Sequence, residues 1–339
     1  MEDGLIGLAL GGGVARGWSH IGVIRALHEA GIFPDIIAGT SIGAVVGGCH
    51  SAKRLDDLED FARGLNRRRM FGYLDFNLAG TGLINGHRLG ETLKQALGDA
   101  QIEDLDTRFV AVATEIGSGH EIWLSQGPLV EAVRASYALP GIFRPVKLNN
   151  RWLFDGALVN PVPISVCRAL GARYVIAVNL NFDLSSRASL APQVEPARPS
   201  PSPSADALDD QADKGVQHAV EFAADETSSG ARKRSNAKRL LQRQLLQRTN
   251  DVPGISTVVV EAFNIVQDRI ARSRLAGDPP DAMISPRLHG IGLFDFHRAD
   301  ELITRGRVAV ARDLETIQHE IDIRRKHGML RDNMKSGAV

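Results

Sequence analysis

The hydrophobic positions in the first half of the chain follow two alternating patterns. Residues 5–10 form a short apolar run that is typical of a buried strand. After a run of glycines, apolar residues recur at helical spacing from Trp18 to Leu27, and Gly31 is a suitable helix end. Strands and helices that alternate in this way predict a mostly parallel sheet with helices on both faces.

The same patterns recur along most of the chain. Further strands are expected at residues 35–38, 108–113, 121–124, 151–154 and 174–178, and an extended segment at 282–285. Further helices are expected at residues 42–51, 129–138, 163–170 and 258–275, followed by a long helix at 298–324. The helix at 42–51 consists of small residues, which allow other elements to pack closely against it.

The composition changes abruptly after residue 182. Residues 183–226 contain nine acidic and three basic side chains and a Pro-Ser repeat, which cannot hold a regular helix or strand. We therefore expect a first core part at 1–182, a disordered and charge-segregated insertion at 183–250, a helical part at 251–327 that packs on the core, and a flexible tail at 328–339.

The end of this insertion has the opposite charge. Residues 231–248 carry seven Lys or Arg and no acid around two leucine pairs, as in a basic amphipathic helix. Two roles stay open for it. It is a candidate for peripheral contact with anionic lipids, and the alternative is a solvated linker helix.

Overall composition narrows the classes of protein further. Forty Lys plus Arg balance forty Asp plus Glu, which argues against nucleic acid as a partner. Cys49 and Cys167 are too few for a disulfide framework, so we expect a reducing compartment. No basic leader precedes residue 5, and no apolar stretch is long enough to span a bilayer. A cytoplasmic protein, peripheral at the inner membrane at most, is the expectation.

The first chemical motif follows the second expected strand. Gly39, Ser41 and Gly43 fit G-x-S-x-G, in which flanking glycines allow a sharp strand-to-helix turn that exposes the serine hydroxyl. The expected strand before it and the expected helix after it supply the required context. The alternative is a glycine-rich turn with a serine that caps the helix. Ser41 is the candidate nucleophile.

A glycine-rich loop follows the first strand. Gly11, Gly12, Gly13 and Val14 can present several backbone N–H groups to one oxygen anion, as an oxyanion hole does. A nucleotide-binding loop and a purely structural turn are the alternatives. No frame of this loop matches G-x-G-x-x-G, and the chain contains no G-x-x-x-x-G-K-[ST], so nucleotide binding is disfavoured.

A carboxylate lies at the end of the strand expected at 151–154. Asp155, followed by Gly156, is the best candidate for a catalytic base, because sites in parallel sheets lie at strand ends, although Asp-Gly is also a common turn. None of the ten histidines occupies a convincing strand-end loop after this acid. A Ser–Asp pair without histidine is the economical interpretation. With an ordinary pKa near 3.9, Asp155 is a weak base.

Together these motifs resemble the patatin-like phospholipase family, most closely its bacterial stand-alone members. The segments 135–146 and 155–163 also look typical of that family, and the resemblance covers residues 5–182 and 254–312. It implies an α/β/α fold that hydrolyses lipid acyl esters, with Ser41 as nucleophile and Asp155 as base. The oxyanion loop would be Gly11, Gly12 and Gly13, supported by Arg16 and Gly17.

One position departs from the family pattern. Where the family has a glycine, this chain has Val14, which retains a backbone N–H but adopts a positive φ only at a cost. The sequence shows no metal-ligand cluster, so we expect neither a cofactor nor a calcium requirement. The expected partner is a phospholipid or lysophospholipid substrate.

Two other functions stay open on the same fold. Acyltransferases that act on thioesters place a histidine just before the serine, and that position is Thr40 here, which counts against an acyltransferase or thioesterase. A catalytically silent regulatory protein is the second alternative. The presence of Ser41, Asp155 and the glycine loop argues against it.

Overall fold

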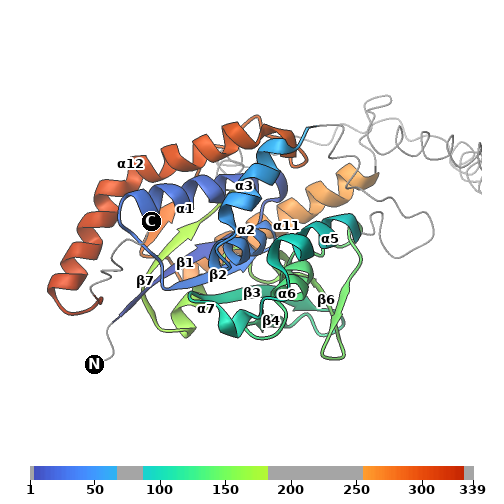
Figure 1. Ribbon diagram of the computed structural model, residues 1–339, viewed down its shortest axis with the longest axis horizontal. Helices are drawn as coiled ribbons and strands as arrows, with labels where there is room; N and C mark the ends of the chain where they lie inside the picture. The colour runs from blue at the N-terminus through green and yellow to red at the C-terminus, as the bar shows by residue number, and fades with distance from the viewer. Residues whose placement is uncertain (1–3, 67–86, 182–254, 332–339) are drawn as a thin grey trace, which may run out of the picture. The chain divides into compact units, whose positions relative to one another are not determined.

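The computed structural model describes residues 4–66, 87–181 and 255–331 (Figure 1). Residues 259–331 belong to the same compact unit as residues 4–181. The insertion expected at 183–250, including the basic segment 231–248, lies outside the described residues, as does most of the expected tail.

One eight-stranded sheet forms the centre of this unit. Its strands are β1 (Leu5–Leu10), β2 (Ile36–Thr40), β3 (Arg108–Glu115), β4 (Glu121–Leu124), β5 (Val146–Leu148), β6 (Arg151–Asp155), β7 (Ala172–Val178) and β8 (Ala282–Ile284). The strands are hydrogen-bonded in the order β5-β6-β3-β2-β1-β7-β8, in which β2 and β6 follow one another along one edge of β3 and β4 pairs with its other edge. The run β3-β2-β1-β7-β8 is parallel, whereas β4, β5 and β6 join antiparallel. The predicted mostly parallel sheet is confirmed.

Helices cover the sheet in the predicted α/β/α arrangement. The α-helices are α1 (Ser19–Glu29), α2 (Ile42–Ser51), α3 (Leu55–Gly64), α5 (His87–Leu97), α6 (Leu129–Ser136), α7 (Ile164–Ala169), α11 (Ile255–Gly277) and α12 (Ala299–Lys326). The short 3₁₀ helices are η1 (Val14–Trp18), η2 (Ile102–Asp104), η3 (Gly156–Leu158) and η4 (Phe296–Arg298). Strand β5 and helices α3 and α5 were not expected from the sequence.

Alternate residues of β1 face two different hydrophobic cores. Ile6, Leu8 and Leu10 belong to the large core that includes residues of α1, α2 and α12. Ala9 belongs to a smaller core on the opposite face with residues of α7. Because successive side chains of a strand point to opposite faces, the continuous apolar run in the sequence corresponds to a strand that is buried on both sides.

Helices α1 and α12 cross at two glycines. A Cβ on Gly22 would lie 1.9 Å from the backbone oxygen of Ile303, and a Cβ on Gly306 would lie 2.0 Å from that of Ser19. No side chain fits at either position, so the two backbones pack directly against each other. This crossing attaches the C-terminal helix to the first helix after the glycine loop (Figure 1).

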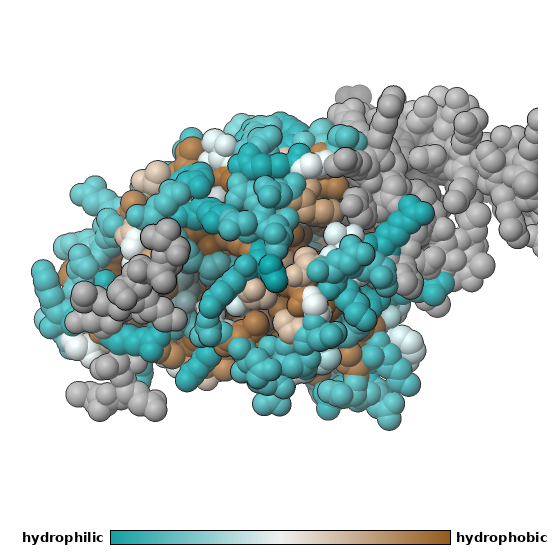
Figure 2. Space-filling model, in the orientation of Figure 1, coloured by the Kyte–Doolittle hydropathy of each residue, from teal (hydrophilic) through white to brown (hydrophobic). Residues whose placement is uncertain are grey.

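Hydrophilic residues cover much of the face shown in Figure 2, and hydrophobic residues are visible between them near its middle. Among the described helices, none is long and apolar enough to cross a membrane.

Candidate active site

The turn between β2 and α2 holds Ser41 in an unusual backbone conformation. Its φ is 58° and its ψ is −125°, a region that non-glycine residues rarely occupy. A Cβ on Gly39 would lie 2.6 Å from the Ala44 backbone, and one on Gly43 would lie 2.2 Å from the Leu10 oxygen. Both glycines of the motif are therefore required by close backbone approach.

The register of strand β3 brings Ser41 and Asp155 together. Thr40, the last residue of β2, pairs with Val112, and Asp155, the last residue of β6, pairs with Ala113. Strand β4 pairs with β3 along the opposite edge, so β2 and β6 end side by side on the same edge of β3. The serine and the carboxylate, far apart in the sequence, thus meet where two strands terminate.

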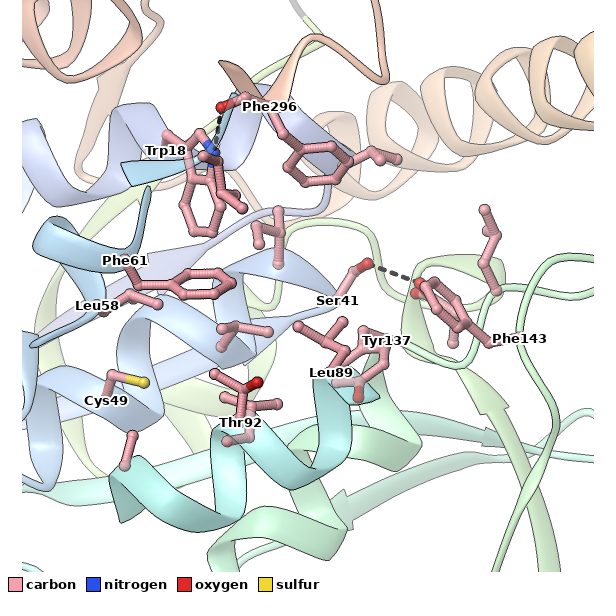
Figure 3. A pocket seen from close by; sticks show the side chains of 18 of the residues that line it. Trp18, Ser41, Cys49, Leu58, Phe61, Leu89, Thr92, Tyr137, Phe143 and Phe296 are labelled. Carbon is pink, nitrogen blue, oxygen red and sulfur yellow. Dashed lines mark hydrogen bonds between the residues drawn. The ribbon is translucent and has the colours of Figure 1, made fainter. Parts of the chain in front are cut away.

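The two side chains form a buried hydrogen-bonded pair. Ser41 Oγ donates to Asp155 Oδ2 across 2.6 Å (Figure 3), and the other carboxylate oxygen accepts the backbone N–H of Ala157 at 2.9 Å. Asp155 is only 1% exposed and Ser41 only 7%. Among the described residues, Ser41 is the one side chain that hydrogen-bonds the Asp155 carboxylate. A nucleophile and a proton acceptor at this distance are what acyl transfer requires.

Burial changes the acid strength of Asp155. Loss of solvation raises its pKa to about 7, against the opposing effect of the hydrogen bonds from Ser41 and from Ala157. From the sequence, the Asp155 carboxyl was expected to have an ordinary pKa near 3.9 and hence to be a weak base. With this raised pKa, the ionised carboxylate is a better proton acceptor near neutral pH than an exposed aspartate is.

Two further hydroxyl groups hold the pair in place. Ser136 Oγ accepts the backbone N–H of Ser41 at 2.9 Å and donates to the Val112 oxygen at 2.6 Å. Thr114 Oγ1 donates to the backbone oxygen of Asp155 at 2.9 Å. The sequence reasoning did not identify either residue, although Ser136 lies in the segment 135–146 that resembles the family.

The glycine loop offers fewer free amides than expected. The N–H of Gly11 donates to the Val178 oxygen at 3.1 Å, and that of Gly12 donates to the Pro161 oxygen at 3.0 Å. The N–H groups of Gly13 and Val14, by contrast, form no hydrogen bond to any other described residue. They start the helical segment η1, where the first N–H groups have no acceptor within the helix. Of the four N–H groups expected to bind an oxyanion, two therefore already donate to carbonyl oxygens and two remain as candidate donors.

Val14, which stands where the family pattern has a glycine, has a positive φ although it is a valine. Its φ is 53°, in the left-handed region that β-branched residues adopt at a cost. Glycine adopts this region without that cost, and the Val14 side chain lines the cavity beside Ser41.

The remaining predicted residues make close contacts with other elements. Arg16 is buried and donates from Nε and a terminal nitrogen to the Ile291 oxygen. A Cβ on Gly17 would lie 2.2 Å from the Ile42 side chain, and one on Gly156 would lie 2.2 Å from the Val112 oxygen. His20 Nε2 lies 2.8 Å from the Gly11 oxygen, and burial lowers its pKa to about 4.

An apolar cavity of about 210 Å³ opens beside Ser41 (Figure 3). Ser41 and Asp155 contribute to its wall, and helices α2, α3 and α5 supply half of the other residues. Its residues include Val45 and Cys49 of α2, Leu58 and Phe61 of α3, and Leu89 and Leu93 of α5. No motif marks these residues, and the sequence analysis did not identify the cavity.

The described residues contain no group of three or more His, Cys, Asp or Glu side chains that could hold a metal ion.

Comparisons with known proteins identify several that are similar to this chain. A family model described as patatin-like phospholipase matches residues 8–168. An uncharacterized NTE family protein of Mycobacterium tuberculosis is 33% identical over 94% of this chain and 93% of its own length. The lysophospholipase NTE1 of Yarrowia lipolytica is 36% identical over 52% of this chain but only 12% of its own length. The crystal structure of VipD from Legionella pneumophila aligns over 93% of this chain and 67% of its own, with 13% identity and a TM-score of 0.42.

Proposed function

This chain belongs to the patatin-like phospholipase family, and from that membership we propose that it is a serine hydrolase that releases fatty acid from phospholipids or lysophospholipids. The observation that carries the proposal is the buried Ser41–Asp155 hydrogen bond of 2.6 Å in the wall of an apolar cavity. Membership of the family supports action on lipid esters, and the pair supplies the chemistry.

In the first step, Ser41 Oγ attacks the carbonyl carbon of the ester while Asp155 Oδ2 accepts its proton. The carbonyl π bond opens, and its electron pair moves to the oxygen of a tetrahedral intermediate. We assign stabilisation of this oxygen to the N–H groups of Gly13 and Val14, which form no hydrogen bond to another described residue and lie at the positive end of the helical segment that begins there. The intermediate then expels the alcohol, which takes the proton from Asp155.

In the second step, water replaces the alcohol. Asp155 accepts a proton from the water as it attacks the acyl-serine, and the collapse of the second intermediate returns Ser41 with its proton and releases the fatty acid. One carboxylate can serve both steps because its pKa of about 7 allows it to take up and give up a proton near neutral pH.

The cavity supports an acyl chain as the group bound beside the nucleophile. Its lining is almost entirely apolar, and it extends along α2 from Ser41 to Cys49. Eight residues of α-helix correspond to about 12 Å. A hydrocarbon chain that enters from Ser41 would bury most of its surface there, which is favourable in proportion to the apolar area removed from water.

The structure favours none of the alternatives. Thr40, which occupies the position of an acyltransferase histidine, is fully buried and donates from Oγ1 to the Asn160 oxygen at 2.8 Å. This hydrogen bond fixes the Thr40 side chain, and because the side chain is buried it cannot contact a substrate. The intact Ser41–Asp155 pair likewise gives no reason to prefer a silent regulatory protein. Cytoplasmic location and lipid contact through 231–248 stay predictions.

The test is hydrolysis of lysophosphatidylcholine and p-nitrophenyl esters by the wild type, by Ser41→Ala and by Ser118→Ala. Ser118 is an exposed serine and serves as the matched control. We expect hydrolysis by the wild type and by Ser118→Ala, and none by Ser41→Ala. Equal activity in folded Ser41→Ala would overturn the proposal.

A further inference from the structure

Helix α11 presents an unusually polar buried face to the core. Four of its residues, Phe263, Asn264, Gln267 and Ala271, recur at helical spacing and are less than a tenth exposed. Two of the four carry side-chain amides. Buried amides are ordinarily satisfied by hydrogen bonds, so an exception on this face needs a physical reason.

Gln267 is that exception. Its side chain is only 3% exposed, and its Oε1 is fully buried without a hydrogen-bond partner among the described residues. A polar atom that is removed from water and left unpaired destabilises the folded protein, and a catalytic role is one physical reason for which such an atom is retained.

The unpaired end of Gln267 lies beside the nucleophile. A Cβ placed on Gly12 would lie 3.6 Å from Gln267 Oε1, 3.5 Å from Ser41 Cβ and 3.4 Å from Ala157 Cβ. These three groups therefore surround one small space, which is open because residue 12 has no side chain. The same space adjoins Gly13, the next residue of the glycine loop.

A side-chain amide can present either of its two ends to this space. Oxygen and nitrogen of the amide have nearly the same shape, and a half-turn about the last torsion exchanges them. In that orientation the NH₂ group of Gln267 is a neutral donor at the position now assigned to Oε1.

We propose that Gln267 contacts the substrate and donates a hydrogen bond from its side-chain amide to the ester carbonyl oxygen as that oxygen becomes negative. This inference rests on the proposed hydrolase function. It adds one side-chain donor to the backbone N–H groups of Gly13 and Val14, and it gives α11, which follows the region outside the described residues, a direct part in the reaction.

The test compares Gln267→Leu and Gln267→Glu with the wild type. Leucine keeps the volume without a donor, and glutamate keeps the shape as an acceptor. We expect kcat on a p-nitrophenyl ester to fall about tenfold to a hundredfold in both, with KM within about twofold, because the bond strengthens in the transition state. The affinity for a trifluoromethyl ketone, whose serine adduct carries the same anion, should fall in parallel, whereas that for the matching methyl ketone should not.

A structural role for Gln267 predicts a different pattern. Ala271→Gly is the matched control, because it weakens the same buried face of α11 one turn further on without touching the space over Gly12. We expect this variant to have a lower melting temperature and a kcat within about threefold of the wild type. If Gln267→Leu and Ala271→Gly lose kcat equally, or if both Gln267 variants keep kcat within twofold, the inference is wrong.

The outcome is separable from failure of the proposed function. Wild-type hydrolysis that depends on Ser41 but not on Gln267 overturns this inference alone. A wild type that hydrolyses no ester overturns both.

Discussion

The two sides of Ser41 are built on different principles. On the polar side, Asp155, Ser136 and Thr114 are connected by directional hydrogen bonds of 2.6 to 2.9 Å. On the other side, the cavity beside α2, α3 and α5 is lined mainly by apolar side chains such as Val45, Leu58 and Leu93, which can interact only by packing. Hydrogen bonds fix atoms to a fraction of an ångström, whereas packed apolar walls tolerate exchange of one side chain for another of similar volume. Mutations should therefore separate the rate of the chemistry from the choice of acyl chain.

The largest expected effect is on the polar side. Asp155→Asn keeps the shape of the carboxylate but removes the proton acceptor, so kcat should fall by roughly three to four orders of magnitude. Steady-state hydrolysis of a p-nitrophenyl ester measures the loss, and circular dichroism checks that the variant is folded. Retention of a tenth of the activity would mean that Asp155 is not the base.

Gly12→Ala should come next. Its Cβ would have only ordinary contacts, 3.4 to 3.6 Å from its neighbours, so the variant should fold with nearly the wild-type melting temperature. It fills the space over Ser41, however, and we expect kcat/KM to fall about a hundredfold. The same substitution at Gly11 places Cβ 2.8 Å from the Val178 oxygen and should lower stability instead. A fully active Gly12→Ala would show that substrate does not use this space.

The raised pKa of Asp155 predicts that kcat/KM depends on pH, with a loss at low pH similar in size to that expected for Gly12→Ala. The base must be ionised, so log kcat/KM should fall with unit slope as the pH drops below about 7 and level off above it. A midpoint near 4, the ordinary value of an aspartate, would contradict the buried environment.

The same pKa makes a prediction about stability. Because the folded-state pKa lies above the unfolded value, the folded protein holds the proton more tightly, and the wild type loses stability as the pH rises from about 4 to about 7. Asp155→Asn escapes this loss. The free energy of unfolding of Asp155→Asn minus that of the wild type should therefore increase by a few kcal/mol between about pH 4 and about pH 7, and it should stay constant above pH 7. Chemical denaturation at pH 4.5 and 8.5 measures the difference, and equal differences would contradict the sign.

The smallest effect is expected in the cavity. Cys49→Phe narrows its far end, about 12 Å along α2 from Ser41. Hydrolysis of long-chain p-nitrophenyl esters should fall about tenfold, while that of the acetate and butyrate stays within twofold. The ratio of kcat/KM between long and short chains is the measurement. A uniform loss for all chain lengths would mean that the two sides are not independent.

The same contrast explains what the sequence could reveal. Ser41 and Asp155 were predicted because each lies in a short local motif at the end of a strand, and both strands had clear apolar patterns. Ser136, Thr114 and Gln267 act through contacts with residues far away in the chain, and no local pattern marks such contacts. The cavity was missed for the same reason, because α3 and α5 were not recognised as elements and their apolar residues look like those of any amphipathic helix.

The glycine loop shows what a local motif leaves open. The run of glycines predicted an anion-binding turn, and two of its N–H groups form no hydrogen bond to another described residue. Which two are free depends on the carbonyl groups of Pro161 and Val178, whose positions follow from the packed sheet. The positive φ of Val14 likewise could not be inferred from a residue type that disfavours it.

The most direct test of the central claim is peptide mapping after reaction with a fluorophosphonate, which forms a covalent bond only with an activated serine. The account predicts a single adduct on the peptide that contains Ser41, formed more slowly in Asp155→Asn and absent in Ser41→Ala. An adduct on any other serine, or no adduct on the folded wild type, would contradict the claim that Ser41 and Asp155 form a catalytic pair.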